Sequence, residues 1–396
     1  MRDEIVVTGL GMWTPYGRGA GAFWQGLMSG RPALRHVDRF DCGHKGYRSN
    51  LAASIPGMGC EASGETEAVA ATMIETVLAD TMADAAVEPG DLPAYDVALV
   101  LGVTQGLPVQ FRASRVSTAR QALCRIGSGA ILSKLAARIG AQGYVGSVST
   151  ACASGTQSIG VAYGLLESGR ARRVFAGGFG YFSEASFSGF NIFRLLSKSG
   201  CRPFDAERDG VILGDGFVLT VLEKQELARS RSAHIYGRVL GYASGNEAFH
   251  ATAPDPTGKS AYETMLRCFE GKTEYLEQLD YVNAHGTGTM ANDPAELAAI
   301  SRLAAHRSSK RAIAVSSTKG HHGHALGAAG SIEFAATLLA IVHQTVPPTC
   351  GLAEPAAVYD EIELIRGLPS QRTVRLALSN SFAFGGNLAS LVVGAP

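Results

Sequence analysis

The sequence has no excess of charge of either sign. Its 396 residues include 35 basic and 35 acidic side chains, which cancel to a formal net charge of zero, and charged residues make up only 18% of the chain. A chain without a basic excess gives no reason to expect nucleic acid or an anionic membrane as a partner, although a local basic patch remains possible. Few charges together with 46% hydrophobic residues predict extensive buried surface and a subunit interface.

The sequence also lacks a recognisable leader and a long apolar run. The opening residues 1–4 carry two acids and lead directly into a strand-like segment, so we expect no signal peptide. The longest apolar run near the end, Phe334–Val342, is shorter than the ~20 residues that cross a bilayer. We therefore expect a soluble, cytoplasmic protein with no membrane contact.

Cysteine pairs and a complete dinucleotide loop are missing as well. The seven cysteines are scattered without a C-x-x-C pair, which argues against a disulfide framework and a zinc ribbon. Gly9-Leu10-Gly11 begins like a dinucleotide-binding turn, but Thr14 replaces the third glycine and Pro15 follows where a helix should continue. We expect neither a cofactor nor a metal.

One cysteine lies at a distinctive position in the segment Ser147–Gly160. Apolar residues before Cys152 (Tyr144, Val145 and Val148) predict the end of a buried strand, and Ile159, Ala162 and Leu166 follow at helical spacing. A helix N-terminus favours an anion, which predicts a Cys152 pKa in the range ~3.5–7.5 and a nucleophilic thiolate. The alternative is that Cys152 is a small buried apolar residue, as most free cysteines are.

Two later glycine-rich turns carry histidines. They are Asn283–Thr289, which contains His285, and Ser317–Gly330, which contains Lys319 and His324. A cysteine early in the chain with histidines later is the order expected when catalytic groups meet in space rather than in sequence.

The remaining pattern predicts a layered α/β protein, because strand-like and helical segments alternate in both halves. We expect strands at Ile5–Gly11, Val97–Val103 and Val174–Gly178, helices at Thr66–Ala86 and Pro108–Gly140, and loops at Ala53–Glu65 and Phe179–Leu196. Asp293 and Glu296 have the spacing of helix caps, at N-cap and N3, and we interpret them as caps rather than catalysts. Residues 235–241 faintly echo residues 5–11.

These motifs together resemble the 3-oxoacyl (β-ketoacyl) synthase family, the condensing enzymes of fatty acid and polyketide assembly. The resemblance covers nearly the whole chain and includes, besides the cysteine and histidine turns, the segments Val6–Gly17, Arg202–Gly210, Leu213–Gly216 and Asn380–Gly386. It implies a thiolase-like, five-layered αβαβα fold with two pseudo-repeated halves. We predict that residues 1–235 carry Cys152 and that residues 236–396 carry His285, Lys319 and His324.

The resemblance also implies a reaction. Cys152 would take an acyl group from a thioester on acyl carrier protein, and the backbone amides of Cys152 and Phe384 would form the oxyanion hole. Malonyl carrier protein would then lose CO2 beside His285 and His324, and the enolate would attack the acyl-enzyme. Lys319 would lie near His324 and support it electrostatically. The partners implied are carrier protein and a second subunit, in a homodimer or in a heterodimer with a chain-length-factor-like homologue.

Some positions depart from the family pattern or leave alternatives open. Phe382 and Phe384 would gate the acyl pocket, which Gln105 and Phe193 would help to line. Ala383 and Asn387-Leu388 replace the usual residues of the last motif, which suggests an unusual acyl chain in a specialised polyketide pathway. His321, His322 and His324 are spaced like metal ligands, but no nearby cysteine or acid completes a shell. The rival interpretations are a thiolase, which pairs one histidine with a second cysteine, and a non-catalytic chain-length factor, which typically lacks the cysteine.

Overall fold

The computed structural model describes residues 4–396 apart from 44–45, 64, 105–128 and 310. Gln105 and most of the helix expected at Pro108–Gly140 fall outside the described residues, so only its last part, α4 (Gly129–Ile139), can be compared. The strand expected at Ile5–Gly11 is confirmed and runs on to Thr14 as β1 (Ile5–Thr14), with Gly9 and Gly11 inside it. The helix expected at Thr66–Ala86 is α2 (Glu65–Ala85).

The principal strands form two halves with the same order and the same pattern of pairing. In the first half the order is β6-β5-β7-β8-β1, and in the second it is β11-β10-β15-β16-β9, with β13 outside β11. In each half the first three strands are parallel and the last two pair antiparallel. The halves join where β1 pairs with β9, Ile5 opposite Val239. The echo between residues 5–11 and 235–241 therefore belongs to equivalent strands. These strands are β5 (Val97–Gly102), β6 (Val145–Val148), β7 (Arg173–Gly180), β8 (Gly216–Lys224), β9 (Gly237–Asn246), β10 (Tyr281–Asn283), β11 (Ile313–Ser316), β13 (Ile362–Leu364), β15 (Leu376–Ala383) and β16 (Asn387–Gly394).

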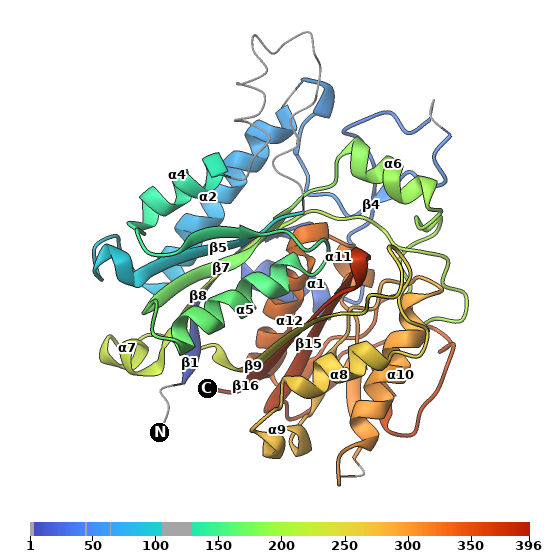
Figure 1. Ribbon diagram of the computed structural model, residues 1–396. Coiled ribbons are helices and arrows are strands. Elements are labelled where there is room, and N and C mark those ends of the chain that lie inside the picture. Colours follow the sequence, from blue (N-terminus) through green and yellow to red (C-terminus); the bar gives the residue numbers. More distant parts are fainter. Residues whose placement is uncertain (1–3, 44–45, 64, 105–128, 310) are drawn as a thin grey trace.

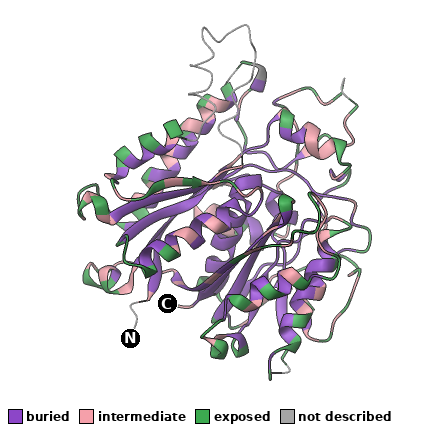
Figure 2. Cartoon of the chain, viewed as in Figure 1, coloured by how far each residue is buried: buried purple, intermediate pink, exposed green. Residues whose placement is uncertain are grey.

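Helices separate and cover the sheets in five layers (Figure 1). α2 and α4 cover the outer face of the first half, and α8 (Lys259–Arg267) and α10 (Asn292–Ala305) cover that of the second. Between the halves lie α5 (Ser154–Glu167) and α12 (Ala329–His343). Figure 2 shows that the central strands and α12 are almost wholly buried. The five-layered, thiolase-like fold with two similar halves is confirmed.

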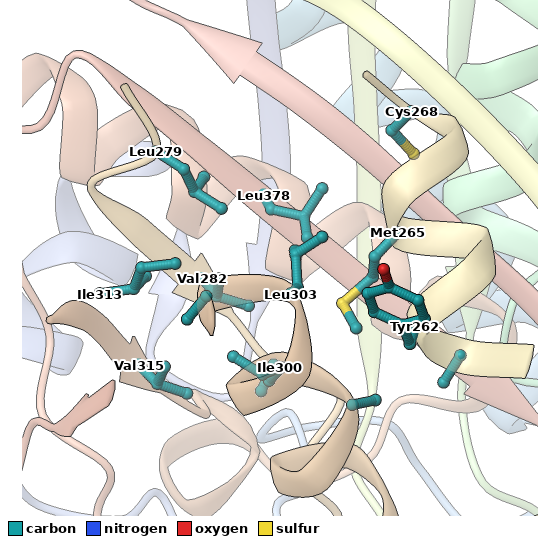
Figure 3. Close-up of a cluster of buried hydrophobic side chains, with 14 of the residues drawn as sticks. Tyr262, Met265, Cys268, Leu279, Val282, Ile300, Leu303, Ile313, Val315 and Leu378 are labelled. Carbon is teal, nitrogen blue, oxygen red and sulfur yellow. The ribbon is translucent and has the colours of Figure 1, made fainter. Parts of the chain in front are cut away.

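The outer core of the second half shows how these layers are held together (Figure 3). Met265 of α8 and Ile300 and Leu303 of α10 face the strand residues Val282 and Leu378. The two α10 residues are three apart in the sequence, so they share one face of the helix. Burying each such side chain contributes about 1.5–3 kcal/mol, which fixes α10 and the turn before it against the sheet.

The two central helices approach each other very closely at their N-termini. A Cβ at Gly155 would lie 2.7 Å from Ser331 Oγ, and one at Gly330 would lie 2.1 Å from Thr156 Oγ1. Glycine is therefore required at both positions for α5 and α12 to pack in this way. Because α5 follows Cys152 and α12 follows the His324 turn, this crossing brings the two motifs together.

Within the described residues, one segment is long and apolar enough to span a membrane by length and composition, namely Leu326–His343. It contains α12, and 89% of it is buried inside the fold. It therefore occupies the position of a core helix and not that of a lipid-exposed span.

Three local expectations were wrong. Tyr144 and Val145 are exposed, because β6 is the edge strand of its half and not a buried one. The loop expected at Phe179–Leu196 contains a helix, α6 (Glu184–Ile192), which begins with a capping box between Ser183 and Ser186. Serine residues spaced as in a capping box could have predicted the start of this helix from the sequence. The loop after residue 52 is not simply exposed, because Ala53–Ile55 are buried.

A buried ion pair anchors the loop that contains Arg39 to the start of β8. The Arg39 guanidinium donates to Asp215 Oδ1 at 3.0 Å and Oδ2 at 2.5 Å and to Phe182 O at 2.9 Å. Asp215 also accepts from the backbone N–H of Ile55. This network fixes the start of α6.

The shorter elements are β2 (Gly17–Arg18), α1 (Ala20–Met28), β3 (Arg35–His36), β4 (Leu51–Ala52), α7 (Gln225–Ser230), α9 (Thr273–Glu277), α11 (Lys319–His322), β12 (Thr345–Val346), β14 (Ser370–Gln371) and the 3-10 turns Glu61–Ser63, Ala94–Asp96, Leu326–Ala328 and Phe384–Gly386.

Candidate active site

A cavity of about 270 Å³ lies between the two halves of the chain. Cys152, His285 and His324 line it together, and Phe382, Phe384 and Leu388 form part of its apolar wall. The three polar side chains are nearly inaccessible, with exposed fractions of 7%, 3% and 2%. The groups that the sequence places 172 residues apart are therefore brought together in a largely apolar chamber.

Cys152 occupies the tight turn between β6 and α5, as the sequence predicts. The residue before it, Ala151, has a left-handed φ of 50°, which turns the chain sharply enough to direct Cys152 into the cavity. Its Sγ lies 2.9 Å from His324 Nε2. The thiol can therefore pass its proton directly to the imidazole.

The expectation of a free thiolate is contradicted by the burial of the sulfur. The pKa of Cys152 is raised to about 12, chiefly by burial and in smaller part by the Glu333 carboxylate, while the Lys319 charge and the backbone N–H of Cys152 only partly oppose this rise. Loss of hydration outweighs the helix N-terminus that the sequence argument relied on. The resting site is a thiol paired with a neutral imidazole, and the thiolate forms when His324 accepts the proton.

Alkylation of Cys152 by iodoacetamide should become faster with increasing pH throughout the range from pH 7 to 10. Only the thiolate is nucleophilic, and with a pKa raised to about 12 its fraction increases roughly tenfold per pH unit in this range. Mass spectrometry of the Cys152 peptide measures the rate, and a Cys152→Ser variant gives the background from other cysteines. A rate that levels off by pH 8 would show a depressed pKa instead.

Lys319 fixes the tautomer of His285. Lys319 Nζ lies 3.0 Å from His285 Nδ1 and 2.5 Å from the His285 carbonyl oxygen. An ammonium group only donates hydrogen bonds, so Nδ1 must accept and the ring proton resides on Nε2. His285 therefore presents an N–H donor from Nε2 while remaining uncharged.

Lys319 acts on His324 through its charge, as expected, but within the described part of the chain it makes no direct hydrogen bond to that ring. Its direct contacts are with His285, and it forms a fully buried ion pair with Glu333 of α12. Glu333 was not predicted as a site residue from the sequence. The available signal was one acid in the otherwise apolar run of α12, a position that requires a buried partner.

Both histidines are held in the neutral form. Burial lowers the pKa of His285 and of His324 well below 6.5, and the positive charge of Lys319 lowers each further. Their rings lie 5.7 Å apart in an edge-to-face arrangement. Two uncharged imidazoles are thus available on one side of the sulfur, one in contact with it and one beyond.

The two acids of the Asp293–Glu296 motif hold the His285 turn and do not cap α10. That helix begins at Asn292, its N-cap is Ala291, and no side chain caps it. Glu296 accepts from the backbone N–H of His285 and of Gly286, both at 2.7 Å, and Asp293 accepts from Thr287 N at 3.1 Å. The capping interpretation was wrong because the spacing of a cap also fits a carboxylate that reaches back to the preceding turn.

The other two histidines of the second turn point away from the cavity. His321 Nε2 lies 2.8 Å from Pro348 O, and His322 Nε2 lies 3.0 Å from Thr318 Oγ1. The three imidazoles therefore do not converge. Among the described residues, no group of three histidine, cysteine, aspartate or glutamate side chains is arranged to hold a metal ion.

Aromatic rings line the approach to the sulfur. The Phe384 ring stacks on Phe190 of α6 with centroids 5.8 Å apart, and Phe193 meets it edge-on at 6.2 Å. Phe190 also faces the His324 ring at 6.4 Å. Phe193, which we expected in the acyl pocket, is 56% exposed and is not one of the residues that line the cavity.

The departures in the last motif are accommodated without strain. Ala383 has an extended backbone (φ −143°), so its Cβ costs nothing there. Asn387 Nδ2 donates to Phe384 O at 3.2 Å, which ties the turn to its own strand. Leu388 is buried and lines the cavity beside Phe382, its partner across the strand pair.

Two family models match the chain in the order in which its halves occur. The model for the beta-ketoacyl synthase N-terminal domain matches residues 2–228, and that for the C-terminal domain matches residues 236–353. The chain belongs to the beta-ketoacyl synthase family. The resemblance predicted from the motifs is confirmed.

Relatives and solved structures agree with this family assignment over the whole chain. A 3-oxoacyl-[acyl-carrier-protein] synthase 2 of Synechocystis sp. is 33% identical over 98% of this chain and 97% of its own length. The tetracenomycin polyketide synthase ketoacyl synthase alpha subunit of Streptomyces glaucescens is 32% identical over 99% and 97%. The ishigamide ketosynthase/chain length factor superposes with a TM-score of 0.84 at 28% identity, covering both chains completely. A chain from the structure of a type II PKS acyl-carrier protein in complex with its ketosynthase superposes with a TM-score of 0.84 at 25% identity, again with complete coverage of both chains.

Proposed function

We propose that this protein is an elongating β-ketoacyl synthase that joins an acyl chain held on Cys152 to the enolate of malonyl carrier protein, with loss of CO2. The observation that carries the proposal is the contact of Cys152 Sγ with His324 Nε2 at 2.9 Å, beside a second neutral imidazole, inside an apolar cavity. Family membership supports the same class of reaction.

In the first step Cys152 is the nucleophile. Its proton moves to His324 as sulfur attacks the thioester carbonyl, and expulsion of the carrier thiol leaves an acyl-enzyme. The backbone amides of Cys152 and Phe384 are the proposed donors to the oxyanion, and loss of one such donor typically costs ~2.7–4 kcal/mol. The stacked rings of Phe384 and Phe190 support Phe384 as a gate, and Phe382 forms the adjoining wall.

In the second step the two imidazoles stabilise the enolate. His285 can donate from Nε2, because Lys319 occupies its Nδ1, and His324 lies next to the sulfur. An apolar chamber favours loss of the charged carboxylate as neutral CO2, since the carboxylate there lacks its hydration. Lys319 is a positioning residue in this proposal: it orients His285 and contributes positive charge without reaching the cavity.

The cavity favours this reaction over the two rivals. Among the described residues that line it, Cys152 is the single cysteine, whereas a thiolase requires a second one beside its histidine. A non-catalytic chain-length factor has no need of the Cys152–His324 pair.

Two threonines could bind the arm of the carrier protein in this proposal. Thr287 and Thr289, whose hydroxyls are 2.9 Å apart, line the cavity and provide polar partners for the amides of a pantetheine arm.

The proposed assembly is a dimer of like or homologous subunits in the cytoplasm. Edge strand β6 supports it, because Val145 and the preceding Tyr144 are exposed and, among the strands of the described residues, β6 stands at the end of its sheet. Such an edge is usually covered.

We also propose residues 1–235 and 236–396 as the two structural halves, with the boundary between α7 and β9.

Incubation with acyl carrier protein thioester and malonyl carrier protein tests the proposal. We expect release of one CO2 for each β-ketoacyl thioester formed, and no product from Cys152→Ala. Consumption of acetyl thioester without CO2 release would indicate a thiolase, and product formation by Cys152→Ala would place the nucleophile elsewhere.

A further inference from the structure

Two asparagine side chains hold the turn that carries Phe384. This turn, Phe384–Gly386, joins β15 to β16. Phe384 O accepts a hydrogen bond from Asn387 Nδ2 at 3.2 Å. The next carbonyl oxygen, that of Gly385, accepts one from Asn246 Nδ2 at 2.8 Å. Successive carbonyl groups of the turn are therefore fixed by side chains as well as by the hairpin.

The two asparagines are partners across neighbouring strands. Asn246 is the last residue of β9, Asn387 is the first of β16, and the two lie opposite each other in the antiparallel pair. β15, β16 and β9 lie side by side in the second half (Figure 1). Asn246 Oδ1 also accepts from the backbone N–H of Ala248 at 2.8 Å, which directs its Nδ2 towards the turn. We call Asn246 and Asn387 the asparagine clamp.

The two glycines of the turn need this support. Gly385 and Gly386 have left-handed φ angles of 79° and 74°, which favour glycine. A Cβ at Gly385 would lie 3.2 Å from Asn387 Nδ2, and one at Gly386 would lie 3.0 Å from Asn246 Oδ1. The clamp therefore fills the space that side chains would take. Since glycine has the greatest backbone freedom of all residues, the rigidity of the turn comes from its partners.

The clamp holds the turn from outside the cavity. Phe384 and Gly386 line the cavity, whereas neither asparagine is among its described lining residues. Asn246 is exposed and Asn387 is half-buried. Asn387 is also one of the residues by which the chain departs from the family motif. The two amides can therefore act on the reaction only through the backbone of the turn.

We propose that Asn246 and Asn387 are positioning residues that hold the backbone N–H of Phe384 towards the oxyanion formed when Cys152 is acylated. The inference rests on the proposed function, which assigns this N–H to the oxyanion hole. The peptide before Phe384 is fixed by the pairing of Ala383 with Asn387, and the peptide after it is fixed by the clamp. An oxyanion donor is effective when it is held in place before the charge develops.

Replacing either asparagine by alanine tests the clamp. Asn246→Ala and Asn387→Ala should each slow acylation of Cys152 about three- to tenfold, the effect of one lost hydrogen bond. The loss should appear in kcat and not in KM, because the clamp does not line the cavity. Single-turnover mass spectrometry measures the rate over a range of donor concentrations, with hexanoyl-N-acetylcysteamine and with hexanoyl acyl carrier protein as donors.

Ser244→Ala is the matched control. Ser244 is an exposed polar residue of β9 two positions before Asn246, on the same face of the strand. The variant should be acylated at the wild-type rate. If it slowed acylation as much as Asn246→Ala does, any change at this end of the strand would have the same effect and the clamp proposal would be wrong.

Alkylation by iodoacetamide separates the position of the Phe384 N–H from other effects. Sulfur displaces iodide in this reaction, so no oxyanion forms at a carbonyl, yet the same thiolate and the same access to Cys152 are required. Both clamp variants should be alkylated at the wild-type rate. If alkylation slowed as much as acylation, the clamp would support the sulfur or the fold. If both reactions became faster, the clamp would be a barrier to entry. Either result would overturn the proposal.

The remaining outcomes distinguish the clamp from the proposed function. If the wild type were acylated on Cys152 and both clamp variants matched its rate, the clamp proposal alone would fail. If the wild type were acylated by neither donor, the proposed function would fail and the clamp proposal with it.

Discussion

Replacing Lys319 by methionine should lower the free energy of unfolding by about 3–5 kcal/mol at pH 8, because it leaves the Glu333 carboxylate buried without its cation. Both side chains of this pair have an exposed fraction of 0%. Burial raises the pKa of Glu333 to about 7 even though Lys319 lowers it, so without Lys319 this pKa rises further, and the cost of burying the carboxyl increases with pH. The deficit should therefore be smaller at pH 5.5, which denaturant unfolding at the two values would show.

A double variant separates the structural role of Lys319 from its role in the reaction. Lys319→Met/Glu333→Leu removes both charges and should recover most of the lost stability, since replacing a whole buried pair by apolar residues is often neutral. It should not recover condensation, because His285 Nδ1 loses its donor and the tautomer is no longer fixed. A double variant that condensed at the wild-type rate would reduce Lys319 to a structural residue.

Removing the two histidines one at a time should have unequal effects on the two steps. His285→Ala should leave acylation of Cys152 nearly unchanged and lower condensation by ~10²–10⁴-fold, the usual contribution of a positioned acid or base. His324→Ala should slow both steps, because His324 Nε2 contacts the sulfur directly. Single-turnover acylation followed by addition of malonyl carrier protein measures the steps separately.

His343→Ala provides the control for these variants. It removes an imidazole from the other end of α12, where it stacks on Trp24 with ring centroids 4.7 Å apart. Both steps should proceed at the wild-type rate. Equal loss of acylation and condensation in His285→Ala would contradict the division of labour between the two imidazoles.

The sequence predicts the site residues better than it predicts their chemistry. Glycine-rich turns beside strand and helix patterns place Cys152, His285 and His324 at the ends of elements, and the repeated α/β pattern with the family motifs predicts two similar halves. The pKa of Cys152 could not be inferred in this way. A helix N-terminus is visible in the sequence, whereas the burial that raises this pKa to about 12 depends on packing between residues distant in the chain.

The contacts of the supporting residues could not be predicted for a related reason. Glu333 and Glu296 act through contacts with partners 14 and 11 residues away, across turns whose geometry the sequence does not specify. The same holds for Lys319, which turns towards His285 rather than towards His324, its nearer neighbour in the sequence. Edge strand β6 was misjudged because an apolar pattern does not distinguish a central strand from an edge strand.

The central claim is that Cys152 carries the growing chain while the two neutral imidazoles act beside it. Intact-protein mass spectrometry after incubation with acyl carrier protein thioester, without malonyl donor, tests it most directly. The account predicts one acyl adduct per chain, located on the Cys152 peptide, absent from Cys152→Ala and discharged when malonyl carrier protein is added. An adduct that survives in Cys152→Ala, or that malonyl carrier protein does not discharge, would contradict it.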